Sequence, residues 1–304
     1  MPCRRAAMVL LAFTATAGTV VGCAPPATVR PVRLDADALA VPGTPPTGYE
    51  AAVRSIAAVM ARDLALPLPP EVTLYVYPSR TAYAAGLADA AGMPASRARE
   101  IAGYSVGLGQ RGRLFIHDGA LRDTPRSVWL GILAHELTHV AQYELSGGRR
   151  GQSEQWLREG MADWVACQVL ERLGAGTFRD ERAQAMQAVA MDLPRLRSDA
   201  VDLVDLGRPQ GWESRHLRSG ERLTYRLAFL LTDELIRRHG FDRVMAYFRA
   251  FADSDERSRH FETAFGVTLA QFEADALARL RHEAEIAVTP APPWPVPPAD
   301  LSSR

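Results

Sequence analysis

The residues LGILAHELTHVAQYEL (Leu130–Leu145) decide how this sequence is interpreted. Within them, His135, Glu136 and His139 form the pattern H-E-x-x-H. On a helix, side chains four positions apart lie one turn apart on the same face, so both imidazoles can reach one metal ion. A carboxylate between them can accept a proton from a water molecule that such an ion activates. The pattern therefore predicts a helix that carries part of a metal site.

The flanking residues support a helix around this pattern. Thr124 is a suitable N-cap and Pro125 a suitable first helical residue. We expect the helix to continue to about Leu145, because Gly147 and Gly148 can end it. The alternative is that both histidines make ordinary hydrogen bonds on a helix face. A capped amphipathic helix with a glutamate between the histidines favours the metal site instead.

A second run of residues, WLREGMAD (Trp156–Asp163), offers a further ligand. Catalytic zinc takes three protein ligands and keeps a fourth position for water, so two histidines require a partner. Glu159, twenty positions after His139, is the best candidate. Asp163 lies one turn later and can accept a hydrogen bond from the far nitrogen of a ligand histidine. A solvated acidic face is the alternative, but the neighbouring residues are apolar, and burying two unpaired carboxylates is costly.

The N-terminal residues predict export from the cytoplasm. Residues 1–23 combine two early arginines with an apolar stretch that is short for a membrane-spanning helix, which indicates a signal peptide. Residues 20–23, VVGC, resemble a lipobox, so we expect Cys23 to carry a lipid anchor at the cell membrane. Conventional cleavage near Ala24 or Ala27, giving an extracytoplasmic protein without an anchor, is the alternative. The Pro-rich residues 24–47 and 289–304 predict a tether and a tail.

Between these segments the sequence predicts an α+β fold, with a small, mainly antiparallel sheet and the motif-bearing helix in residues 48–145 and helices in residues 146–288. The first part is expected to contain a helix from Gly48 to Leu64, a strand at Val72–Tyr77, a helix from Ser79 to about Ala91, a short helix after Pro94 and a hairpin within Tyr104–Ile116. The second part is expected to contain helices from about Ser153 to Leu173, at Asp180–Met191, from Gly220 to Gly240, at Phe241–Phe251 and at Leu269–Ile286, with an irregular stretch at Pro194–Gly211. A capping box of Thr268 and Gln271 is expected to begin the last helix.

Composition excludes several other classes of protein. The 35 basic and 35 acidic residues give a net charge of zero, so no nucleic-acid partner is expected. The absence of lysine excludes a lysine Schiff base. Cys3 and Cys23 belong to the N-terminal segment, and Cys167 alone supports no disulfide framework. We expect Cys167 to be a buried apolar residue and His117 to lie at a strand end, away from the metal site.

The sequence segments Leu130–Leu145 and Trp156–Asp163 resemble those of the gluzincin metallopeptidases. The resemblance rests on H-E-x-x-H at His135–His139 and on the motif E-G-x-A that begins at Glu159. The spacing between the ligands resembles that of thermolysin, whereas the sequence around Glu159 is more similar to the minimal, peptidase-MA-like gluzincins of bacterial envelopes. The resemblance covers roughly residues 70–285. It implies a zincin-like fold and one zinc ion per chain, with His135, His139 and Glu159 as ligands, Glu136 as general base and Asp163 as the partner of a ligand histidine.

Weaker likeness lies outside these two runs. Arg113–Ile116 is expected in the place of the family's edge strand, which pairs with an extended substrate. Tyr225–Leu230 and Ala264–Leu269 resemble the family's C-terminal helices. The developing oxyanion needs a hydrogen-bond donor, for which Tyr225 is our first candidate and His216 our second. Alternatively, Tyr225 is a core aromatic residue whose hydroxyl is bonded elsewhere.

The sequence thus predicts a zinc-dependent peptidase of the bacterial cell envelope that acts on peptides or proteins. Two other hypotheses use the same residues. One is a catalytically silent, zincin-fold lipoprotein that binds or assembles partners in the envelope, and the other is a hydrolase of a non-peptide amide. An intact Glu136 favours turnover, because a purely structural metal site needs no base. Nothing in the sequence predicts the cleavage specificity or the oligomeric state.

Overall fold

Four short strands form one mixed sheet near the N-terminal end of the chain. The computed structural model describes residues 27–34, 46–192, 203–219 and 221–288. Strands β1 (Thr28–Arg33), β2 (Glu71–Tyr77), β3 (Gly107–Gln110) and β4 (Arg113–His117) lie in the order β1-β2-β4-β3. The outer strands β1 and β3 pair antiparallel with their neighbours, whereas β2 and β4 are parallel. Followed by a mainly helical region, this sheet confirms the predicted α+β class.

Strand β1 lies where we predicted only a tether. It pairs with β2 over its whole length, from Thr28 opposite Val76 to Arg33 opposite Glu71. The β-branched residues of this segment favour a strand, and Val32 is fully buried. An edge strand also tolerates the proline at position 31. Proline content therefore gave the wrong expectation for residues 28–33, which are part of the fold.

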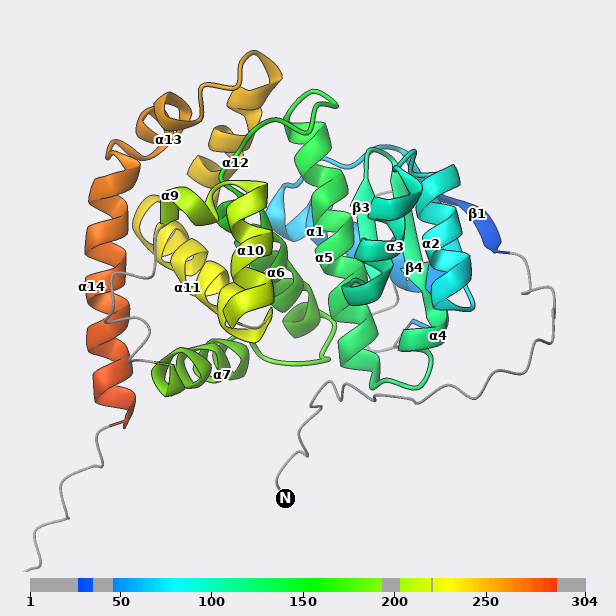
Figure 1. Cartoon of the computed structure of the whole chain (residues 1–304), viewed down its shortest axis with the longest axis horizontal. Helices are drawn as coiled ribbons and strands as arrows, with labels where there is room; N and C mark the ends of the chain where they lie inside the picture. The colour runs from blue at the N-terminus through cyan, green and yellow to red at the C-terminus, as the bar shows by residue number, and fades with distance from the viewer. Residues whose placement is uncertain (1–26, 35–45, 193–202, 220, 289–304) are drawn as a thin grey trace, which may run out of the picture.

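Helices cover both faces of the sheet (Figure 1). On one face, α2 (Arg80–Asp89) and α3 (Ala95–Tyr104) pack over a small apolar core that includes Phe115 of β4. On the other face, the neighbouring residues Leu114 and Ile116 join the main core with α1 (Tyr49–Leu64) and the motif-bearing helix. Side chains alternate between the two faces of a strand, so β4 is buried on both.

Strand β3, which packs against the motif-bearing helix, forms one edge of the sheet, because β4 lies between β2 and β3. The prediction of Arg113–Ile116 as the edge strand was therefore wrong. Strand β4 is longer and more apolar than β3 and is buried along almost its whole length, as befits an internal strand. Strand β3, with the sequence GLGQ, has two glycines and little strand propensity of its own.

The motif-bearing helix is α5 (Arg126–Leu145), which follows the short helix α4 (Asp118–Leu121). Its end is as predicted, but its N-cap residue is Pro125 instead of Thr124. The Thr124 hydroxyl donates a hydrogen bond to the main-chain oxygen of Leu121 at 2.7 Å, so this side chain closes the preceding turn. Figure 1 shows α5 between the sheet with its helices and the helical region.

The helical region is built around α6 (Gln155–Arg172), which is buried on nearly every side and packs against α5 and α11. The other elements are α7 (Phe178–Met191), α9 (Leu203–Leu206), α10 (Pro209–Ser219), α11 (Glu221–His239), α12 (Phe241–Arg249), the 3-10 helix η1 (Ala250–Ala252), α13 (Arg257–Phe265) and α14 (Leu269–Val288). Residues 203–211, which we expected to be irregular, thus contain α9 and the start of α10. The predicted capping box at α14 is present, because Gln271 N–H donates to Thr268 Oγ1 at 3.2 Å and Thr268 N–H to Gln271 Oε1 at 3.0 Å.

The predicted signal peptide, with Cys23, lies outside the described residues, as do most of the predicted tether and the tail. Among the residues that the structure does describe, no helix is both long and apolar enough to cross a membrane. The predictions for the two termini therefore stay predictions.

Candidate active site

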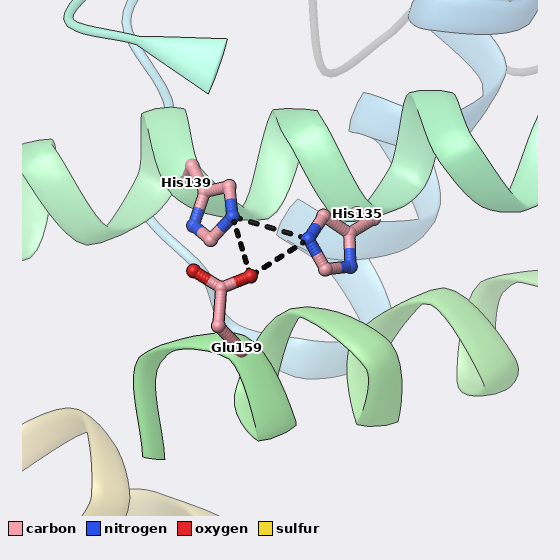
Figure 2. Close-up of side chains that lie close together, drawn as sticks. All are labelled: His135, His139 and Glu159. Carbon is pink, nitrogen blue, oxygen red and sulfur yellow. Dashed lines mark hydrogen bonds and ion pairs between the residues drawn. The ribbon is translucent and has the colours of Figure 1, made fainter. Parts of the chain in front are cut away.

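The packing of α5 on α6 brings the three predicted ligands together (Figure 2). His135 Nε2 lies 3.3 Å and His139 Nε2 lies 3.6 Å from Glu159 Oε2. The two Nε2 atoms are 3.2 Å apart. Zinc bonds of about 2.0–2.1 Å in a tetrahedron would separate neighbouring ligand atoms by about 3.3 Å. The three atoms therefore fit one metal ion of this size and geometry.

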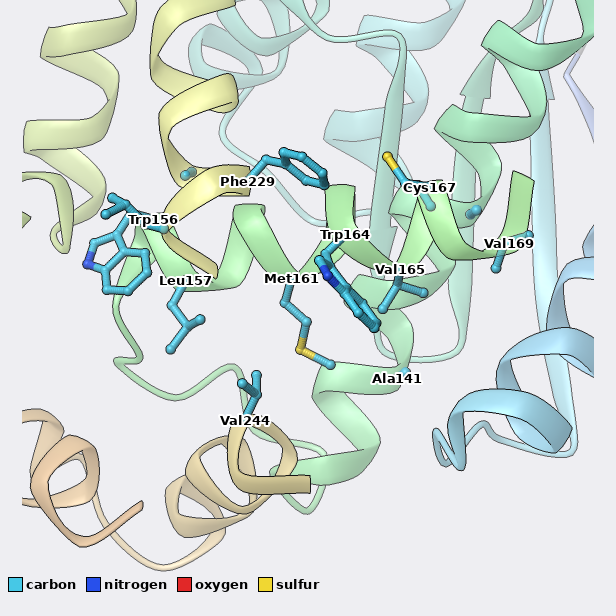
Figure 3. Packing of buried hydrophobic residues seen from close by; sticks show 14 of the residues in the cluster. Ala141, Trp156, Leu157, Met161, Trp164, Val165, Cys167, Val169, Phe229 and Val244 are labelled. Atoms are coloured by element: carbon cyan, nitrogen blue, oxygen red, sulfur yellow. The ribbon is translucent and has the colours of Figure 1, made fainter. Parts of the chain in front are cut away.

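The position of Glu159 depends on how closely α6 approaches its neighbours. A Cβ on Gly160 would overlap the main-chain oxygen of Ala228 and the side chain of Thr232, so α6 and α11 cross at this glycine. Apolar side chains of α6, among them Leu157, Met161 and Val165, fill the space around the helix (Figure 3). This core holds the ligand-bearing turn of α6 against α5.

Hydrogen bonds select the ligand atom of each residue. His135 Nδ1 lies 2.8 Å from Asp163 Oδ1, which leaves Nε2 facing the other two ligands, as predicted. His139 Nδ1 lies 2.9 Å from Gln142 Oε1. Gln155 Nε2 donates to Glu159 Oε1 at 2.8 Å, so Oε2 is the oxygen that faces the imidazoles.

The electrostatic environment is that of a buried site with several close charges. Burial opposes protonation of His135, but the carboxylates of Asp163 and Glu159 outweigh it and raise the pKa of the imidazole well above its ordinary value. Burial also disfavours the charged form of Glu159, yet the nearby imidazoles outweigh it and lower the pKa of this carboxyl. Glu159 is therefore an ionised carboxylate, the form that binds a metal.

Glu136 lies beside the three ligands and is held by the sheet. The main-chain N–H of Gly109 in β3 donates to Glu136 Oε2 at 2.6 Å. A Cβ on Gly107 would lie 2.8 Å from Glu136 Cγ, and a Cβ on Gly109 would overlap the main-chain oxygen of Glu136. The two glycines thus let β3 lie directly on α5. Burial raises the pKa of Glu136 above its ordinary value.

Tyr225, our first candidate for the oxyanion donor, lies near the ligands on α11. Its ring centroid is 6.3 Å from that of His135 and 5.1 Å from that of Trp212 in α10. The second candidate, His216, is also in α10, but its side chain lies outside the described part. His117 is buried at the end of β4, where it stacks on Tyr83 with ring centroids 5.6 Å apart.

Cys167 is a buried free thiol of the main core, and burial raises its pKa. It contributes apolar packing, as predicted. Within the described residues, the candidate metal-ligating set is therefore His135, His139 and Glu159.

Sequence reasoning missed Gln142, Gln155 and Gly109. The two glutamines could have been found, because Gln142 lies three positions after His139 and Gln155 four positions before Glu159, spacings that bring helical side chains together. Gly109 could not have been found in this way, since its contribution is a main-chain N–H whose direction depends on the pairing of β3.

Comparison with protein families supports a peptidase. Residues 113–191 match the model of the family described as BSP, peptidase of plants and bacteria. The matched segment runs from β4 to α7 and contains every group of the site except Gly109 and Tyr225. It covers less than half of the chain. No curated protein and no solved structure matches the sequence.

Proposed function

We propose that this chain is a zinc-dependent peptidase of the bacterial cell envelope. The observation that carries the proposal is the position of Glu136, a carboxylate that is not one of the three ligands but is held next to them by Gly109. Two imidazoles and one carboxylate form one of the ligand sets of catalytic zinc, which keeps one position open. The family match of residues 113–191 favours a peptide bond as the substrate.

In this proposal, Glu136 is the general base and afterwards the general acid. When bound, a zinc ion would lower the pKa of a water molecule and polarise the substrate carbonyl. The Gly109 N–H holds Oε2 of Glu136, which leaves Oε1 free to accept the proton of the attacking water and to deliver it to the leaving amine. Tyr225 is the candidate donor to the oxyanion that develops on the carbonyl. The exposed edge beside these groups belongs to β3, so we expect an extended substrate to lie along that strand.

The test is a peptide-library cleavage profile of the wild type against Glu136→Gln, with the zinc content of both measured. The variant is expected to keep about one zinc per chain and to lose hydrolysis by at least about 100-fold, the range of general-base contributions. Glu144→Gln, on the same helix but away from the ligands, is the matched control and should cleave like the wild type. Turnover in Glu136→Gln equal to that of the wild type would refute the role of Glu136 as general base.

Two results would favour the other hypotheses instead. A wild type that binds zinc but cleaves no peptide in the library would support the catalytically silent binding protein. Cleavage of amide compounds outside the peptide class, dependent on Glu136, would support the non-peptide hydrolase.

We further propose that Cys23 anchors the protein to the cell membrane through a lipid. Strand β1 begins at Thr28, so only residues 24–27 separate Cys23 from the fold. Four residues span at most about 18 Å between the flanking Cα atoms, which would keep the sheet close to the membrane. Mass spectrometry of the mature N-terminus tests this, and Cys23→Ser should release the protein from the membrane fraction. Recovery of a chain that begins at Ala24 or Ala27 without a lipid would contradict the proposal.

A further inference from the structure

Two buried polar side chains, Gln142 and Arg158, lie on the side of His139 that faces away from the metal site. Neither residue belongs to the H-E-x-x-H motif. Gln142 lies on α5, one turn after His139, and is fully buried. Arg158 lies on α6, next to Glu159, with 4% of its surface exposed. Each of the two helices that build the metal site thus contributes one of these residues.

The hydrogen bonds of Gln142 allow only one orientation of its amide. Its Nε2 donates to the main-chain oxygen of Arg158 at 2.9 Å, and a carbonyl oxygen can only accept. Gln142 Oε1 must therefore face the other way, where it lies 2.9 Å from His139 Nδ1 and 3.1 Å from Arg158 Nη1. Because an amide oxygen only accepts, the proton of this contact belongs to His139 Nδ1. In the neutral imidazole, the lone pair is then on Nε2, which faces Glu159 and His135.

The guanidinium of Arg158 is fixed by its remaining partners. It donates to the main-chain oxygen of Arg150 and, through Nε, to Ser153 Oγ at 3.3 Å. The group also lies over the ring of Phe248, 5.7 Å from its centroid. Within the described residues it makes no ion pair with a carboxylate. A buried cation is thus held in place chiefly by neutral acceptors, one of which is the amide that orients His139.

We propose that Gln142 and Arg158 are positioning residues, which lock His139 in the tautomer that binds a metal without placing a negative charge behind it. This inference rests on the metal site of the proposed function. The partner of His135 is the carboxylate of Asp163, so the two ligand histidines are supported by opposite means. A carboxylate makes its imidazole more electron-rich, whereas an amide that also accepts from a cation does so much less.

The experiment reads the tautomer and the metal affinity separately. The nitrogen chemical shifts of His139 in the metal-free protein report which ring nitrogen carries the proton, and competition with a chelator gives the Kd for Zn²⁺. Gln142→Met, which has similar volume but no acceptor, should lose the fixed tautomer and bind Zn²⁺ about 10–100-fold more weakly. Gln142→Glu keeps an acceptor for His139 Nδ1 and should therefore keep the tautomer, although its second oxygen can no longer donate to the main-chain oxygen of Arg158.

Thr138→Val is the matched control for a buried polar change in the same helix. Thr138 is fully buried, and its hydroxyl donates only to the main-chain oxygen of Ala134 at 2.7 Å. This variant should leave the tautomer of His139 and the Zn²⁺ affinity unchanged. Arg158→Met should weaken Zn²⁺ binding in the same direction as Gln142→Met, because the amide loses the donor that holds it.

Two outcomes would overturn the inference. One is a Gln142→Met protein with the wild-type tautomer and affinity, and the other is a loss of affinity in Thr138→Val as large as in Gln142→Met. The tautomer of His139 is measured without metal and without substrate. A protein that cleaves no peptide, or binds no Zn²⁺, would therefore refute the proposed function, whereas the His139 measurement would still decide this inference.

Discussion

The two sides of the candidate active site are built by different means. On the sheet side, β3 contributes a main-chain N–H, from Gly109, and two glycines that make room for it. On the helical side, α6 contributes the side chains of Glu159 and Asp163. The helix α5 lies between the two sides and receives both sets of contacts (Figure 1).

This difference determines which substitutions matter on each side. A side-chain contact depends on the chemical identity of one residue, so the helical side is sensitive to the loss of a charge. A main-chain contact persists with almost any residue that fits, so the sheet side is sensitive to added volume. Substitutions of the two kinds, ordered below from the largest expected effect to the smallest, test the distinction.

The largest effect is expected on the helical side, from Glu159→Gln. This change removes the only negative ligand while keeping the volume of the side chain. Structural zinc sites bind with about 10–16 kcal/mol, and on that scale the loss of one of three ligands lowers the affinity on the order of a thousandfold. The Kd for Zn²⁺ measures it, with Glu171→Gln near the far end of α6 as control. Retention of wild-type affinity would remove Glu159 from the ligand set.

The next effect is expected on the sheet side, from Gly109→Ala. The added Cβ would overlap the main-chain oxygen of Glu136, so β3 must move away from α5. Overpacking of this kind costs about 1–3 kcal/mol of unfolding free energy, and hydrolysis should fall because Glu136 loses its donor. Thermal unfolding and peptide cleavage measure the two effects. In the control Gly103→Ala, the Cβ meets no atom within 4 Å, and little change is expected.

A smaller effect is expected from Asp163→Asn on the helical side. The amide can still lie next to His135 Nδ1, but it no longer supports the imidazole with a charge. Such changes in the partner of a ligand typically cost about 10–100-fold in metal affinity. Zn²⁺ competition should therefore place this variant between the wild type and Glu159→Gln. An affinity equal to that of the wild type would show that the charge of Asp163 is unimportant.

The smallest effect, on the unfolding free energy, is expected from a substitution in an ion pair that links the sheet side to the helical side. Arg97 on α3 forms ion pairs with Glu100 on the same helix and with Glu213 on α10, which connects the sheet side to the helical side. These side chains are partly exposed, at 33% for Arg97 and 39% for Glu213. Arg97→Gln should therefore lower the unfolding free energy by less than about 1 kcal/mol, and less still at high salt. Urea unfolding at two salt concentrations tests this, and a loss of several kcal/mol would contradict it.

The difference between side-chain contacts from helices and main-chain contacts from a strand also explains which parts of the site could be predicted from the sequence. His135, His139, Glu159 and Asp163 were found because helical spacing places chosen side chains on one face, and α5 and α6 are long and regular. Gly109 and the edge position of β3 were missed because strand order and pairing depend on contacts between distant parts of the chain. Strand β1 was missed for a related reason, since its partner β2 begins more than thirty residues later. The two site-bearing helices α5 and α6 were therefore predicted more completely than the sheet, whereas α9 and α10 were not predicted.

Gly160 has a mechanical consequence for the site. Because Gly160 has no side chain, α6 lies directly against the main chain of Ala228 and the side chain of Thr232 in α11. Glu159 precedes the contact by one residue, and Tyr225 lies three residues before Ala228 on the opposite helix. We therefore expect a displacement of α11 to move both the candidate ligand Glu159 and the candidate oxyanion donor Tyr225. We expect adjustment to a substrate to come mainly from the opposite side, where β3 is an edge strand and pairs only with β4.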